Sequence, residues 1–139
     1  MSGFQASCVA IGHRALLITG APGSGKSSLA LGLIDRGARL IGDDSVELLA
    51  LHDRLLARPH PNTQGLLEVR NLGLIKLPVC AEAPVALMIS LDETARRYVE
   101  TAETTGISGI ALPTLRLWPG SPIQPIKAEL ALERFGLMF

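Results

Sequence analysis

A chain of 139 residues, 47% of them apolar, is long enough to bury a hydrophobic core, and we predict a single domain over residues 1–139. Its formal net charge is zero and only 4% of its residues are aromatic, which argues against nucleic-acid binding through bulk charge or base stacking. Cys8 and Cys80 stand far apart without a CxxC spacing, so neither a zinc site nor a disulfide framework is expected. No segment resembles a secretion signal or a membrane span, and we expect a soluble, cytoplasmic protein without a membrane partner.

The first forty residues alternate between strand and helix patterns. Short apolar runs at residues 8–11 and 15–19 predict two strands joined by a turn at residues 12–14. After Gly25 the period changes, because apolar residues recur at helical spacing from Leu29 to Ile34. Gly37 then provides a C-terminal cap for the predicted helix.

The rest of the chain carries mainly strand signals. The predicted strands are residues 39–42, the hairpin arms 46–51 and 55–57, and the runs 85–91 and 112–117, with a loop at 59–65. Residues 94–103 fit either a short helix or an exposed loop, and the tail from Ile126 fits helical or alternating periodicity. The order of the elements predicts an α/β domain with a nucleotide site near its N-terminus.

A complete phosphate-binding motif, GxxxxGK[ST], follows the second predicted strand and precedes the predicted helix. Its glycines allow main-chain N–H groups to surround a phosphate, and the helix N-terminus adds a positive dipole end. Lys26 would contact the β and γ phosphates of ATP, and the Ser27 hydroxyl would bind Mg²⁺. The expected nucleotide-binding residues are Gly20, Ala21, Pro22, Gly23, Ser24, Gly25, Lys26, Ser27 and Ser28.

Two adjacent aspartates, Asp43 and Asp44, follow the strand after this helix. In a parallel α/β sheet that position lies at the carboxyl edge, beside the phosphate site. One carboxylate can serve as general base towards a hydroxyl while the other binds metal through water or orients the first; the alternative is a solvated turn. Glu68 lies in an apolar stretch and by itself reads as an ion pair with Arg70 or an outward-facing strand position.

In these segments the sequence resembles the HPr kinase/phosphorylase family. The resemblance rests on the phosphate-binding motif with the preceding residues 17–20, on residues 29–44 ending in the paired aspartates, and on residues 67–75. It is strongest over roughly residues 5–80. It implies a P-loop domain with a mixed central sheet and flanking helices, similar to the catalytic domain of the family without its N-terminal domain.

The resemblance also implies an activity and roles for individual residues. The family uses ATP to phosphorylate a serine of HPr, a small phosphocarrier protein, and reverses the reaction with inorganic phosphate. By resemblance Asp44 is the general base with Asp43 beside it, Ser27 and Glu68 hold Mg²⁺, and Arg97, or alternatively Arg96, is a catalytic arginine. Family members form hexamers, so we expect a homo-oligomer.

Four positions depart from the family pattern. Gln5 occupies the position of a catalytic histidine, and an amide cannot exchange a proton near neutral pH as an imidazole does. Asn71 replaces a usual glycine, and Trp118 and Ser121 stand where the family has arginines of its phosphorolysis segment. These departures bear mainly on the reverse reaction.

Three functions therefore compete. The first is an HPr-type protein-serine kinase, and the second is a small-molecule P-loop kinase, for which so short a chain has little room for a lid. The third is a non-catalytic nucleotide sensor, which Gln5 favours.

Overall fold

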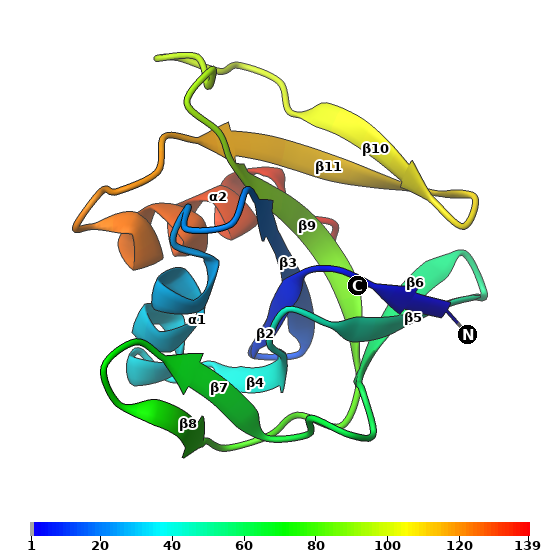
Figure 1. Ribbon diagram of the computed structural model, residues 1–139. Helices are drawn as coiled ribbons and strands as arrows, with labels where there is room; N and C mark the ends of the chain where they lie inside the picture. The colour runs from blue at the N-terminus through cyan, green and yellow to red at the C-terminus, as the bar shows by residue number, and fades with distance from the viewer. Residues whose placement is uncertain (1) are drawn as a thin grey trace.

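A computed structural model describes residues 2–139, and its central feature is a nine-stranded sheet with two helices (Figure 1). The helices are α1 (Lys26–Asp35) and α2 (Gln124–Phe135). The strands are β1 (Ser2–Phe4), β2 (Ser7–Ile11), β3 (Arg14–Gly20), β4 (Arg39–Gly42), β5 (Val46–Leu51), β6 (Arg54–Pro59), β7 (Leu66–Val69), β8 (Gly73–Lys76), β9 (Ala83–Leu91), β10 (Glu103–Ile107) and β11 (Ile110–Leu117).

The sheet is mixed, as the family resemblance predicts. Strands β3, β9 and β11 run parallel side by side, with Gly20 opposite Leu91 and Leu91 opposite Leu117 at their carboxyl ends. Strand β2 is antiparallel to both β3 and β4, and β6 pairs with the beginning of β9. Three strands, β3, β9 and β11, therefore end at one edge, where the loops that follow them start.

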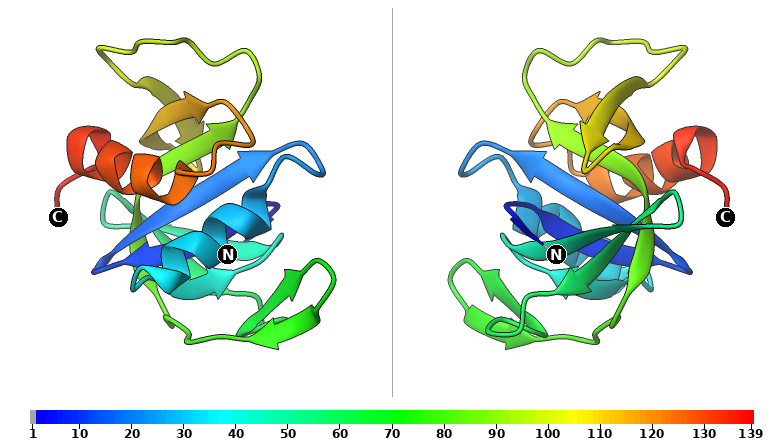
Figure 2. Two further views of the ribbon diagram at one scale, coloured as in Figure 1. Left: turned by 90° about the vertical axis from the view of Figure 1, so that its left-hand side faces the viewer. Right: turned by 90° about the vertical axis from the view of Figure 1, so that its right-hand side faces the viewer.

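The two helices cover one face of this sheet, and they lie side by side in both views (Figure 2). Leu29, Ala30 and Leu33 of α1 are buried against the sheet, because their spacing places them on one side of the helix. The opposite face of the central strands packs against the β5–β6 hairpin, which belongs to the same sheet through the pairing of β6 with the beginning of β9. Leu48 and Leu55 of this hairpin lie in a second buried cluster together with Leu17 of β3. The sheet is thus buried on both faces, which explains the nearly continuous apolar runs of β3 and β9.

A separate two-stranded hairpin, β7–β8, lies beside α1 and carries Glu68. Buried Leu67 attaches it to the cluster under the helices. Asn71, at its turn, has a left-handed backbone (φ 71°), which asparagine tolerates better than most residues. The family's glycine preference at this position therefore has a backbone reason, and the substitution keeps the turn.

Most predicted elements are confirmed, including β2, β3, α1, β4 and the β5–β6 hairpin. Residues 94–103 form no helix: residues 94–102 lie in the loop that joins β9 to β10, and Glu103 begins β10. The tail is helical, since α2 begins at Gln124 with a proline in its first turn. The sequence reasoning missed β1, β10 and the β7–β8 pairing, and in residues 2–139 neither helix is long and apolar enough to cross a membrane.

Candidate active site

The phosphate-binding motif forms the loop between the carboxyl end of β3 and the first turn of α1. Gly23 and Gly25 have φ values of +81° and +103°, a region that other L-residues rarely adopt. Gly25 occupies the N-cap position of α1, and no side chain among residues 2–139 caps the first N–H groups there. Together with the helix dipole, these N–H groups would favour an anion at the loop.

Two polar side chains of the loop point back into it. The Lys26 ammonium group donates a hydrogen bond to the carbonyl oxygen of Gly20, 2.8 Å away. The Ser24 hydroxyl is buried and has no hydrogen-bond partner among residues 2–139. A Cβ at position 20 would overlap that hydroxyl and lie 3.2 Å from Leu91 Cβ, so a larger residue there would require Ser24 to turn away.

Asp43 is the aspartate that meets the phosphate-binding loop. Its Oδ1 accepts hydrogen bonds from Ser27 Oγ at 2.8 Å and Ser7 Oγ at 3.2 Å, and its Oδ2 accepts one from the main-chain N–H of Glu68 at 3.0 Å. Asp44 is exposed and has a left-handed backbone (φ 63°). Three donors therefore orient Asp43, whereas the carboxylate of Asp44 has no hydrogen bond within the described chain.

The strand arrangement explains this meeting and corrects one step of the sequence argument. We expected a parallel sheet to bring the aspartates to the phosphate site, but β2 lies between β3 and β4 and is antiparallel to both. Because β2 is antiparallel to β3 and β4 is antiparallel to β2, β4 runs in the same direction as β3 and still ends at the same edge. The antiparallel pairing also places the beginning of β2, and with it Ser7, at that edge.

Ser7 is the residue of the site that the sequence reasoning missed. It is fully buried on β2, donates to Asp43 and accepts a hydrogen bond from the N–H of Asp44 at 3.4 Å. The available signal was a hydroxyl residue at the start of an otherwise apolar strand beside the predicted site.

Glu68 lies close to Asp43 through its main chain. Its side chain is exposed on β7 and makes no ion pair with Arg70 within residues 2–139. No cluster of three or more His, Cys, Asp or Glu side chains suited to a metal ion occurs in that range. A magnesium site here would therefore depend on Ser27, Glu68 and groups outside the chain, such as phosphate oxygens.

Arg97 is exposed in the loop that leaves β9 at Leu91, and Leu91 pairs with Gly20 at the start of the phosphate-binding loop. The loop carrying Arg97 therefore begins beside the phosphate site, but Arg97 makes no side-chain hydrogen bond or ion pair with the described residues of that site.

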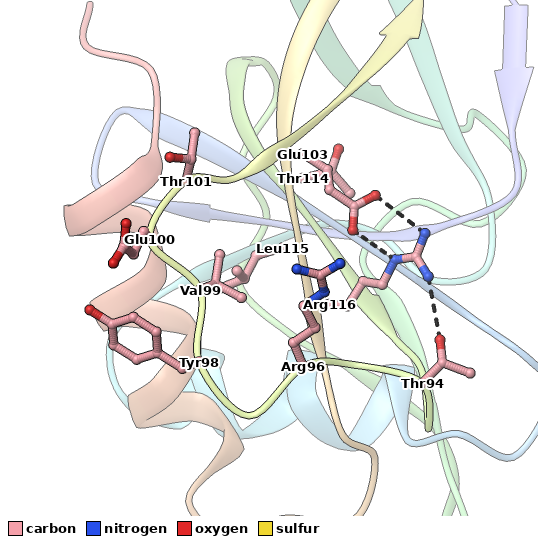
Figure 3. A pocket seen from close by; sticks show the side chains of 10 residues that line it. All are labelled: Thr94, Arg96, Tyr98, Val99, Glu100, Thr101, Glu103, Thr114, Leu115 and Arg116. Atoms are coloured by element: carbon pink, nitrogen blue, oxygen red, sulfur yellow. Dashed lines mark hydrogen bonds and ion pairs between the residues drawn. The ribbon is translucent and has the colours of Figure 1, made fainter.

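A cavity of about 730 Å³ lies between this loop and strands β10 and β11 (Figure 3). Arg96 lines it, and so does Arg116, which forms ion pairs with Asp92 and Glu103. Two hydrogen bonds from Thr94, one from its main chain and one from its hydroxyl, hold the pKa of Asp92 below its usual range. Arg96, the alternative candidate for the catalytic arginine, is the predicted site residue that lines this cavity.

The remaining candidates have structural explanations. Trp118 donates its indole N–H to the carbonyl oxygen of Ala95 at 2.7 Å and so ties the loop to the end of β11. Cys8 and Cys80 are buried free thiols, and burial raises the pKa of the Cys8 thiol far above its ordinary value. A thiol held protonated in this way is a poor nucleophile and metal ligand.

The family model described as "HPr Serine kinase C-terminal domain" matches residues 2–115. The chain belongs to this family. It is 42% identical to the HPr kinase/phosphorylase of Clostridium novyi over 140 aligned positions, which cover 88% of this chain and 45% of that protein. It is 40% identical to the Clostridium acetobutylicum HPr kinase/phosphorylase over 85 residues, 56% of this chain and 28% of that protein.

The fold is similar to the solved structure of the Hpr(Ser) kinase/phosphatase from Coxiella burnetii, with a TM-score of 0.83 and 26% sequence identity. That match covers 96% of this chain and 90% of the other. The architecture of an α/β P-loop domain of the HPr kinase type is therefore confirmed. The chain spans less than half the length of these two clostridial relatives.

Proposed function

We propose that the chain is an ATP- and Mg²⁺-dependent protein-serine kinase that phosphorylates an HPr-type phosphocarrier protein. The observation that carries the proposal is the 2.8 Å hydrogen bond from Ser27 Oγ to Asp43 Oδ1, which joins the phosphate-binding loop to the aspartate pair. Phosphate transfer to a hydroxyl needs a positioned phosphate and a carboxylate that accepts the hydroxyl proton. The names of the clostridial relatives support the choice of acceptor.

The residues present fit a magnesium-bound nucleotide. The first N–H groups of α1 and the Ser24 hydroxyl, which have no side-chain cap and no hydrogen-bond partner among the described residues 2–139, offer donors to phosphate oxygens. The ammonium group of Lys26 is already at the loop. Ser27, with Glu68 on the neighbouring hairpin, would hold Mg²⁺, an oxygen-binding cation. Bound there, the ion would neutralise charge on the β and γ phosphates.

Asp44 is the proposed general base, the role that the sequence resemblance assigns to it. Its exposed carboxylate accepts no hydrogen bond within residues 2–139, whereas both oxygens of Asp43 already accept hydrogen bonds, one of them from the serine expected to bind Mg²⁺. A base must lie within hydrogen-bond reach of the attacking hydroxyl, which has to approach the γ phosphate. Arg97 is kept as the candidate that would stabilise the transferred phosphate if its loop closes over the site.

A nucleotide sensor without transferase activity is the second candidate, because Gln5 cannot move a proton. Gln5 is exposed and lies two residues before Ser7, at the same edge of the sheet. The third candidate function is a P-loop kinase that phosphorylates a small molecule.

The test incubates the protein with ATP, Mg²⁺ and an HPr-type protein and measures phosphoserine on the acceptor by mass spectrometry. We expect transfer of phosphate to the acceptor. Lys26→Ala should lower the rate of transfer at least about 100-fold, because the positive charge that would contact the transferred phosphate is removed. The matched control, Lys127→Ala on α2, removes a lysine far from the loop along the chain and should leave the rate unchanged.

Two further variants separate the aspartates. Asp44→Asn should lower the rate about 100-fold or more, the usual contribution of a general base. Full activity of Asp44→Asn together with a loss in Asp43→Asn would move the base to Asp43. Tight nucleotide binding without transfer to any acceptor would support the sensor, and transfer to a small molecule would support the third candidate.

A further inference from the structure

Trp118 is the only tryptophan of the chain and the first residue after β11. It is 49% exposed, although tryptophan is on average a highly buried residue. Its indole N–H donates a hydrogen bond to the carbonyl oxygen of Ala95, 2.7 Å away, which fixes one edge of the ring. Its main chain is held as well, because buried Gln124 donates from Nε2 to the carbonyl oxygen of Trp118 at 2.7 Å. The chain therefore presents a fixed aromatic surface to solvent.

The position of Trp118 follows from the register of three parallel strands. Gly20 at the end of β3 lies opposite Leu91 of β9, and Leu91 lies opposite Leu117 of β11, the residue before Trp118. These two steps separate Gly20 from Leu117 by about 10 Å, twice the spacing of neighbouring strands. Figure 1 and Figure 2 show the loop after β11 and the phosphate-binding loop at the same end of the sheet. Trp118 thus lies at the edge that carries the phosphate site, two strands away from it.

The aspartate side of the site indicates the direction in which a nucleotide would lie. From β3 the sheet continues through β2 to β4 and Asp43 on one side, and through β9 to β11 and Trp118 on the other. Asp43 contacts Ser27, the residue expected to bind the Mg²⁺ that bridges the β and γ phosphates. A nucleotide whose γ phosphate lies towards these residues would extend its ribose and base towards β9 and β11.

From this we infer that Trp118 is the base platform of the nucleotide site: the base of ATP stacks on the exposed indole while the triphosphate occupies the phosphate-binding loop. The inference rests on the proposed use of ATP and adds to it a binding residue outside the phosphate-binding motif. Every base can stack on an aromatic ring, since each has a π face. Trp118 therefore distinguishes a nucleotide from free phosphates rather than one base from another.

The first test uses the fluorescence of Trp118, which reports on this position because the chain has no other tryptophan. Mg-ATP should quench the emission as it binds. Mg-tripolyphosphate, which carries the phosphates without a base, should bind to the same loop and leave the emission unchanged. Binding of each compound is established independently by titration calorimetry.

The second test measures the Kd of both compounds by calorimetry in variants of Trp118. Trp118→Leu should raise the Kd of Mg-ATP about 5- to 150-fold, the loss that removal of one base–aromatic stack produces, and should leave the Kd of Mg-tripolyphosphate within about twofold of the wild-type value. Trp118→Phe keeps a ring but lacks the N–H that bonds to Ala95, and it should retain most of the affinity for Mg-ATP. The matched control, Leu130→Ala, removes another exposed apolar side chain, on α2, and should change neither Kd.

Equal losses of affinity for Mg-ATP in Trp118→Phe and Trp118→Leu would overturn the role of the ring, because the effect would then come from the hydrogen bond to Ala95. Equal weakening of both compounds in Trp118→Leu, or no quenching by bound Mg-ATP, would overturn it too and leave the kinase proposal standing. An emission shift that depends on protein concentration and not on ATP would assign the exposed ring to a contact with a second copy of the chain instead. Absence of Mg-ATP binding by the wild-type protein would refute the proposed function, and the base platform with it.

Discussion

Gly32, in the middle of α1, lies against Pro125 in the first turn of α2. A methyl group at position 32 would overlap Cγ of Pro125 and come within 3.3 Å of its Cβ. The proline ring is rigid and belongs to the helix, so the two helices would have to separate. We expect Gly32→Ala to lower the free energy of unfolding by about 1–3 kcal/mol, the usual range for overpacking.

The sign of this change is informative because helix propensity acts in the opposite direction. In a helix interior, alanine is favoured over glycine by about 1 kcal/mol. In a Pro125→Ala background the ring is absent, and Gly32→Ala should then raise the free energy of unfolding by about 0.5–1 kcal/mol. The sign reversal, rather than either value, reports the contact between the helices.

Urea unfolding followed by far-UV circular dichroism measures all four proteins of this cycle. Gly106→Ala on β10 is the control, because a methyl group there meets nothing within 4 Å. It should leave the stability unchanged or raise it by up to about 1 kcal/mol. If Gly32→Ala stabilises the wild-type protein, the helices do not approach each other as closely as described.

Three further predictions concern the core, the loop after β9 and the edge of the active site. Leu87→Ala should lower the free energy of unfolding by about 2–5 kcal/mol in the same urea assay, since Leu87 is fully buried on β9. Thr94→Ala removes one of the two hydrogen bonds from Thr94 to Asp92 and should raise the pKa of Asp92 towards its ordinary value in a carboxyl NMR titration. The stabilisation of the fold by this carboxylate is present above the ordinary pKa and is lost as pH falls through the lower pKa of the folded state. An unchanged pKa of Asp92 in Thr94→Ala would contradict the assignment. Gln5→His should increase phosphorolysis of phosphorylated HPr, measured as the pyrophosphate formed when the phosphoryl group passes to inorganic phosphate. No gain in either direction of the reaction would mean that the site works without an imidazole.

The local elements around the phosphate site were predictable because each depends on neighbours in the chain. The phosphate-binding loop follows from its glycines, and α1 follows from apolar residues at helical spacing. The pairing of β7 with β8 was not predictable in this way, since Asn71 replaces the glycine that would signal its turn and Leu74 is exposed. Residues 94–103 had a helical alternative, but the loop is held instead by Thr94 and by the indole of Trp118.

The sequence by itself determined that a phosphate-binding motif stands at the start of α1 and that two aspartates follow the next strand, because both statements depend only on short-range residue order. It also carried enough of the family pattern to indicate the HPr kinase family. Tertiary structure alone decided that Asp43, rather than Asp44, meets Ser27, and that Ser7 joins them. The physical reason is that an antiparallel strand, β2, lies between β3 and β4, and no local pattern encodes which strands become neighbours in a sheet.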